Sequence, residues 1–136
     1  FGFGRNLGGS LLGHAVAQGS AFDGVVLIGT IPSLSDFRRH ASHPSARRFR
    51  TALNGDTSRI DLIKPLDLTA SLRAFDPQHC LIQVGRDDPY MDAGSDKIFQ
   101  RLEAKFQVEY YPDGHAMTAP ATMARRWEFI AALTAG

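Results

Sequence analysis

The stretch FGFGRNLGGSLLGHAVAQG, residues 1–19, gives the first indication of the fold, a glycine-framed turn that leads into a helix. Residues 7–18 have the length and the alanine and leucine content of a buried helix, and Gly19 is suited to end it. Directly before this helix, GRNLGG (residues 4–9) is a glycine-framed turn with Asn6 inside it. Asparagine tolerates positive φ better than most non-glycine residues, and it is also among the best helix N-caps. The stretch predicts either a sharp turn that presents the Asn6 side chain or an ordinary helix start.

The rest of the chain alternates between short apolar runs and helical patterns. The runs at 25–28, 79–85 and 107–112 are typical of strands, and the FGF start at 1–3 has the pattern of a strand end. Helices are predicted at 96–105 and 120–134, and a loop with a short helix at 64–77. This alternation predicts an α/β fold, a three-layer αβα arrangement with a mostly parallel sheet. Gly8 and Gly9 are expected to let the first helix approach the sheet closely.

Residues 33–60 differ from the rest, with five arginines between positions 38 and 50. We expect a mostly helical excursion with a break at Pro44. The apolar residues interleaved with the arginines indicate amphipathic helices, not a stacking platform for nucleic acid: Phe37, Phe49 and Leu53. Two interpretations of the arginines stay open. They form the solvated face of a helix, or they attract an acidic substrate or partner.

Composition excludes several classes of protein. With 136 residues the chain has the size of one small domain, and its formal charge of +1 favours neither nucleic acid nor a membrane surface. No apolar run approaches the roughly 18 residues of a membrane span. The single cysteine, Cys80, excludes an internal disulfide and is expected in a buried strand, which suits a cytoplasmic location. His40, His43 and His79 lack metal-ligand spacing, and His14 is expected to be structural.

Polar residues follow three of the expected strands. Asn6 follows the first, Asp87 and Asp88 lie in GRDDPYMD (85–92), and His115 lies in PDGHAM (112–117). Because the carboxyl ends of parallel strands share one edge of the sheet, we expect these side chains to meet there. The alternatives are an ordinary acidic turn before Pro89 and a histidine in a surface loop.

These motifs resemble those of the α/β-hydrolase superfamily, in its dienelactone-hydrolase-like and esterase branches. Residues 4–8, GRNLG, match the G-x-S-x-G nucleophile elbow at every position except the serine, which is Asn6 here. The resemblance makes Asp88 the triad acid and His115 the triad histidine, and it assigns one oxyanion-hole amide to Leu7. Asp87 is then solvated or caps a turn. The implied reaction is hydrolysis of a small carboxylic ester, with no metal or organic cofactor.

The resemblance covers the whole chain but only the C-terminal half of the fold. It implies that earlier strands, and the loop with the second oxyanion amide, are absent from this sequence. We therefore expect a partner along the open sheet edge, either the N-terminal half of the fold or a second copy of the chain. The segment at 33–60 corresponds to the region where relatives carry a cap over the site.

Asn6 puts the activity in doubt, because an amide nitrogen is neither basic nor readily deprotonated. Ser10 lies about one helical turn further on and is not expected to replace it. Some relatives have an aspartate at the elbow, and Asn6 would be a blocked or deamidating version of it. The sequence therefore predicts an impaired ester hydrolase, and the alternative is a non-catalytic homologue that binds a ligand or another protein.

Overall fold

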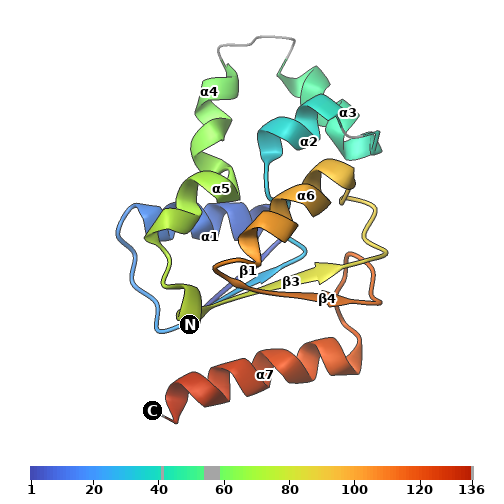
Figure 1. The fold of residues 1–136 in the computed structure, drawn as a ribbon. Helices are drawn as coiled ribbons and strands as arrows, with labels where there is room; N and C mark the ends of the chain where they lie inside the picture. Colours follow the sequence, from blue (N-terminus) through green and yellow to red (C-terminus); the bar gives the residue numbers. More distant parts are fainter. Residues whose placement is uncertain (41, 54–58, 136) are drawn as a thin grey trace.

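The structure, a computed structural model, describes residues 1–40, 42–53 and 59–135. Four parallel strands form one sheet in the order in which they occur along the chain, and they are β1 (Gly2–Arg5), β2 (Val25–Ile28), β3 (Cys80–Gly85) and β4 (Gln107–Tyr111). Helices α1 (Leu7–Ala17) and α6 (Ala93–Leu102) cover one face, and α7 (Pro120–Thr134) covers the other (Figure 1). The predicted three-layer α/β fold with a parallel sheet is confirmed.

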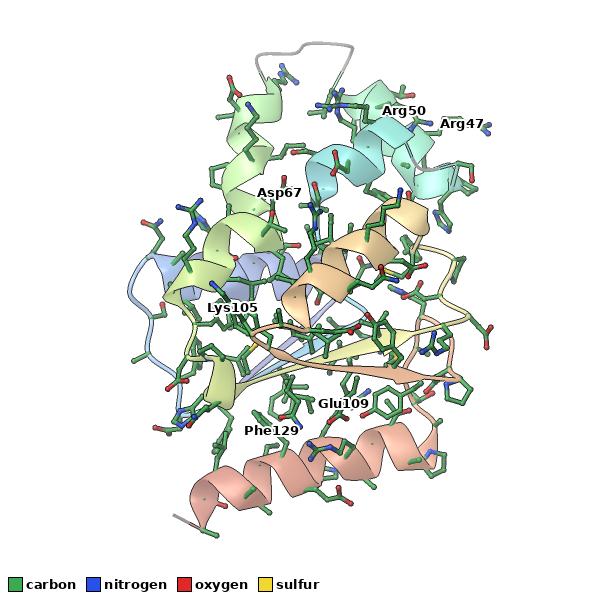
Figure 2. All side chains as sticks on the ribbon, in the orientation of Figure 1. Arg47, Arg50, Asp67, Lys105, Glu109 and Phe129 are labelled. Carbon is green, nitrogen blue, oxygen red and sulfur yellow. The ribbon has the colours of Figure 1, made fainter. Side chains whose placement is uncertain are left out.

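Alternate residues of the two central strands build the core on both faces of the sheet. Val25 and Leu27 of β2 belong to the cluster under α1 and α6, whereas Val26 and Ile28 belong to the cluster under α7. Phe129 of α7 packs into the second cluster (Figure 2). A strand with both faces covered by helices typically has a near-continuous apolar sequence, as β2 has.

The segment between β2 and β3 is built from short helices. They are α2 (Leu34–His40), α3 (Pro44–Ala52), α4 (Ile60–Ile63), η2 (Lys64–Leu66), α5 (Leu68–Ser71), η3 (Leu72–Ala74) and η4 (Pro77–His79). Ile31, Leu34, Phe37 and Ala46 form a third apolar cluster of their own. The prediction of helices interrupted at Pro44 is confirmed, and residues 41 and 54–58 of the expected excursion lie outside the described part. Figure 2 shows Arg47 and Arg50 at the α2 and α3 end of the molecule.

Helix α7 has the predicted bounds, 120–134, whereas α6 spans 93–102 and not the predicted 96–105. Helix α6 begins at Ala93 and not at 96, because the carboxylate of Asp92 accepts the N–H of Ser95 and caps the helix. In α7, Met123 and Trp127 lie on the outer face, and Trp127 is 64% exposed. The apolar residues of this helix therefore do not all face the sheet.

The first strand lies at an edge of the sheet. In the described part of the chain, β1 pairs with β2 alone. Phe1, Phe3, Leu7 and Leu11 are each about half exposed beside this edge. An edge of this kind presents backbone N–H and C=O groups that can pair with another strand.

Cys80 begins β3 and is fully buried, as predicted. Burial raises the pKa of its thiol to about 12, so the group is neutral and acts as a core residue. Among the described residues, no helix is both long enough and apolar enough to cross a membrane.

Candidate functional site

The turn between β1 and α1 has the geometry of an elbow. Asn6 adopts φ 50° and ψ −122°, and its side chain makes no capping hydrogen bond to the helix. The backbone N–H of Asn6 instead donates to the carbonyl of Ile28 at 3.0 Å, which ties the turn to the end of β2. Asn6 therefore occupies the N-cap position of α1 but does not cap the helix through its side chain. The backbone of Asn6 is in a strained conformation at the end of β1, and its side-chain amide makes no hydrogen bond to the helix.

Two glycines make this turn possible. A Cβ on Gly4 would lie 2.5 Å from the Cα of Gly9, and a Cβ on Gly9 would lie 1.9 Å from Oγ1 of Thr30. The expected close approach at Gly9 is confirmed. The same expectation for Gly8 is wrong, because a Cβ there would meet nothing within 4 Å.

Asp88 and His115 lie side by side at the ends of β3 and β4. Nδ1 of His115 is 2.8 Å from Oδ2 of Asp88, and the Asp88 side chain is fully buried. Its second oxygen, Oδ1, accepts the backbone N–H of Tyr90 at 2.9 Å. A buried carboxylate with this partner can orient the imidazole and stabilise its protonated form. The neighbouring Asp87 is exposed.

Gly29 places the elbow beside this pair. It follows Ile28, which accepts the Asn6 N–H, and it adopts φ +52°. A Cβ on Gly29 would lie 3.3 Å from Oδ2 of Asp88 and 3.6 Å from Nδ1 of His115. Asn6 and the Asp88–His115 pair therefore flank the same end of β2. A direct meeting of Asn6 with His115 stays a prediction.

Tyr90 contacts both the pair and the helices above the sheet. Its ring packs against the imidazole of His115 with centroids 4.3 Å apart and against that of His43 with centroids 4.1 Å apart, and both ring pairs are tilted. Its hydroxyl lies 3.3 Å from Oγ of Ser45. His43 also accepts the N–H of Ser45 through Nδ1 and so begins α3. Sequence reasoning missed Tyr90, Ser45 and His43, because only the fold brings them to the site.

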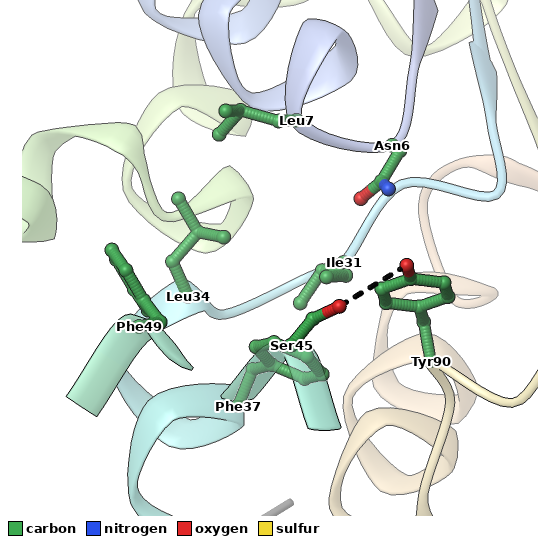
Figure 3. Close-up of a pocket in the computed structure, with 8 residues that line it drawn as sticks. All are labelled: Asn6, Leu7, Ile31, Leu34, Phe37, Ser45, Phe49 and Tyr90. Carbon is green, nitrogen blue, oxygen red and sulfur yellow. Dashed lines mark hydrogen bonds between the residues drawn. The ribbon is translucent and has the colours of Figure 1, made fainter. Parts of the chain in front are cut away.

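A cavity of about 240 Å³ opens beside Asn6 (Figure 3). Eight residues line it, and they are Asn6, Leu7, Ile31, Leu34, Phe37, Ser45, Phe49 and Tyr90. Figure 3 shows the Asn6 amide and the hydroxyls of Ser45 and Tyr90 at one end, with Leu7, Leu34 and Phe49 at the other. The cavity therefore has a polar end at the elbow and an apolar end under α2 and α3.

The loop that carries His115 is held by side chains from α7 and β3. Arg126 donates to the carbonyl of Met117 and to the side chain of Gln83, which is fully buried. Burial, with a contribution from Arg5, lowers the pKa of the Arg126 guanidinium. Met117 itself adopts φ 51°. Arg126 thus fixes the second strained turn of the site from below.

Asp113 fixes the same loop from its other end. Its carboxylate accepts the N–H of Ala119, the N–H of Gly114 and the hydroxyl of Thr122. The hydrogen bond from Ala119 is the main reason that the pKa of Asp113 is lowered. Because the folded-state pKa lies below the unfolded one, the carboxylate stabilises the fold above its unfolded pKa, and this contribution is lost as pH falls through the folded pKa.

We expect Asp113→Asn to lower the free energy of unfolding at pH 7 by about 1 kcal/mol, because an amide has a single acceptor oxygen and cannot keep all three hydrogen bonds of the carboxylate. The difference from the wild type should shrink as the pH falls below the unfolded-state pKa of an aspartate, about 3.9, and toward the lowered pKa of folded Asp113. Urea unfolding between pH 7 and pH 3 measures it, with Asp23→Asn at an exposed position as the control. A difference that does not change with pH would contradict the assignment.

The other residues considered from sequence lie away from this arrangement. Ser10 is fully buried in α1, in the described part of the chain its Oγ has no hydrogen-bond partner, and it does not line the cavity beside Asn6. His79 ends η4 beside a different cavity. Within residues 1–40, 42–53 and 59–135, no group of three or more histidine, cysteine, aspartate or glutamate side chains could hold a metal ion.

Comparison with solved structures finds proteins of similar fold. Two structures of esterase B from Lactobacillus rhamnosis, one with an inhibitor described as C6-C4 SN3, match 98% of this chain with a TM-score of 0.62. Their sequence identities to it are 15% and 14%. The chain has an α/β-hydrolase-like fold. No protein-family model and no curated protein sequence matches it.

The chain spans about half the length of these esterase structures, 52% and 51%. At such low identity the likeness concerns the fold alone. In this chain, Asn6, Asp88 and His115 follow the carboxyl ends of β1, β3 and β4, respectively. The fold alone does not give the function of these residues, which depends on the chemistry of the site.

Proposed function

We propose that this chain carries the nucleophile position, the acid and the base of an ester-hydrolase site, with hydrolysis impaired because Asn6 stands where serine would attack. The observation that carries the proposal is the 2.8 Å contact between His115 and the buried Asp88. It occurs at the strand ends of an α/β-hydrolase-like fold, next to an elbow with positive φ.

Each residue has a role in the proposed site. His115 would take the proton of an attacking hydroxyl, and Asp88 would hold the imidazole in the required orientation. Leu7 is the first residue of α1, so its N–H lacks an intrahelical acceptor and is suited to bind an oxyanion. Asn6 cannot attack an acyl carbon. The proposed chemistry needs neither a metal nor an organic cofactor.

The experiment that tests the proposal is to restore serine at position 6 and to measure the hydrolysis of a p-nitrophenyl ester. A gain in hydrolysis rate of several orders of magnitude is expected.

The alternative function is binding without catalysis. Asn6 itself favours it, because its amide can donate and accept hydrogen bonds at the polar end of the cavity but cannot form an acyl intermediate. The two functions are distinguished by the serine variant. A site that only binds would retain ligand affinity and gain no hydrolytic activity.

We also propose that the free edge of β1 is covered in the functional protein, by the N-terminal half of the fold or by a second copy of the chain. The unpaired edge and the half-exposed Phe1 and Phe3 support the proposal. So does the match to half of the longer esterase structures.

The 136-residue chain by itself is accordingly expected to self-associate or to be poorly soluble. Sedimentation velocity over a range of concentrations measures this. Phe3→Lys should shift the distribution toward monomer, whereas Leu62→Lys, an equally apolar but distant exposed position, should not. A stable monomer with a cooperative thermal transition would contradict the proposal.

Three further assignments stay predictions. They are the dienelactone-hydrolase-like branch, a single domain over residues 1–136 with a cap over 33–60, and a cytoplasmic location. A neutral, buried Cys80 is compatible with a reducing compartment.

A further inference from the structure

We propose that the cavity beside Asn6 binds a small, electrically neutral amphiphile, such as the primary amide or an ester of a short acyl chain. In this proposal the hydroxyls of Ser45 and Tyr90 recognise its polar head. The inference deepens the proposed function and rests on it for the reactive position at Asn6, but it concerns ligand recognition and not turnover.

The first argument is the charge of the lining. None of the eight residues around the cavity carries a formal charge, and five of them are apolar. A carboxylate placed there would find hydrogen-bond donors, among them the N–H of Leu7, but no cationic side chain in the lining would offset the loss of its hydration. The lining therefore favours a neutral head group over an acid.

The second argument is a free hydrogen at the polar end. The hydroxyls of Ser45 and Tyr90 lie 3.3 Å apart, and one of the two donates to the other. Among the residues that the structure describes, neither hydroxyl has a further hydrogen-bond partner. Two hydroxyls have two hydrogens and their mutual bond uses one, so one donor stays available to a ligand.

The third argument is the Asn6 amide at the same end of the cavity (Figure 3). Its side chain is not used as a helix cap, so its NH₂ can donate to a ligand carbonyl and its oxygen can accept from an amide N–H. Asn6 and the Ser45–Tyr90 pair together offer donors and an acceptor. This combination fits a neutral amide or ester head.

The fourth argument is size. At about 30 Å³ for each non-hydrogen atom, the volume of a water molecule in the liquid, a cavity of 240 Å³ accommodates roughly eight such atoms. Leu7, Leu34 and Phe49 at the far end favour an alkyl or small aromatic tail. Hexanamide has this size and this polarity, and hexanoate is its charged equivalent of the same shape.

The experiment is a titration of the full-length protein at pH 7, followed by protein-observed NMR, with hexanamide, hexanoate and toluene as probes. We expect hexanamide to bind at least about tenfold more tightly than hexanoate, since no cationic side chain lines the cavity to neutralise the charge of the acid. Ser45→Ala and Tyr90→Phe each leave one hydroxyl and should have small effects. The double variant should weaken hexanamide binding about tenfold and leave toluene binding unchanged.

The control is Ser20→Ala combined with Tyr110→Phe, which removes one hydroxyl of each kind away from the cavity. Tyr90→Phe keeps the ring on His115, so an effect of the double variant cannot be assigned to a displaced histidine. The proposal is overturned if hexanamide does not bind, if hexanoate binds as tightly, or if the double variant binds hexanamide like the wild type. Parallel loss of toluene binding also overturns it, because the hydroxyls would then act on cavity shape. Failure of hydrolysis in the serine variant, with hexanamide binding retained, would instead refute only the proposed function.

Discussion

Asn6→Ser is expected to raise the hydrolysis rate of p-nitrophenyl butyrate by about 10³-fold or more, measured in the full native chain. The reason is that the other members of the proposed triad are already in contact. His115 lies 2.8 Å from Asp88, and the elbow backbone at residue 6 has the positive φ of a presented side chain. Serine would supply the missing hydroxyl without altering the turn. The loss of a triad nucleophile typically costs several orders of magnitude in rate.

Two controls separate this explanation from a less specific one. Asn6→Ala also removes the amide but adds no nucleophile, so its rate should stay at the wild-type level. His115→Ala in the serine background should abolish the gain, because it removes the base that is in contact with Asp88. A serine variant as inactive as the alanine variant would refute the assignment of residue 6. Wild-type turnover that disappears in His115→Ala would refute the claim of impairment.

Gly9→Ala is expected to lower the free energy of unfolding by about 3 kcal/mol, the upper range for overpacking a core. The added Cβ would lie 1.9 Å from Oγ1 of Thr30, a residue that is only 1% exposed and has little room to move. The matched variant is Gly8→Ala, one position earlier on the same helix. It meets nothing within 4 Å and should be neutral or more stable by up to about 1 kcal/mol.

Urea unfolding of the two variants measures this difference. Thr30→Ala combined with Gly9→Ala should restore part of the stability, since the two nearest atoms of Thr30 are removed while its Cβ, 2.8 Å away, stays. If Gly9→Ala is as stable as Gly8→Ala, the close packing of α1 on the end of β2 is not what holds the elbow.

The order of the elements and the positions of the polar residues at strand ends could be predicted from the sequence. The apolar run at 25–28 and the mostly apolar run at 80–85, which contains the buried Gln83, are typical of strands covered on both faces, because a one-sided strand would alternate with polar residues. Parallel strands in chain order place their carboxyl ends at one edge. Asp88 and His115 could therefore be paired from sequence, although 27 residues separate them.

The surroundings of these residues depend on tertiary packing and could not be predicted from the sequence. Tyr90, Ser45 and His43 come from separate segments, and no spacing in the chain predicts that their rings and hydroxyls meet. The difference between Gly8 and Gly9 is likewise invisible in the sequence, since it depends on which of them faces Thr30. The local sequence pattern shows which face of a helix or strand is apolar. A cavity, in contrast, is formed by the long-range packing of several helices and strands. The ligand that fits the cavity depends on that packing, and the sequence pattern does not reveal it.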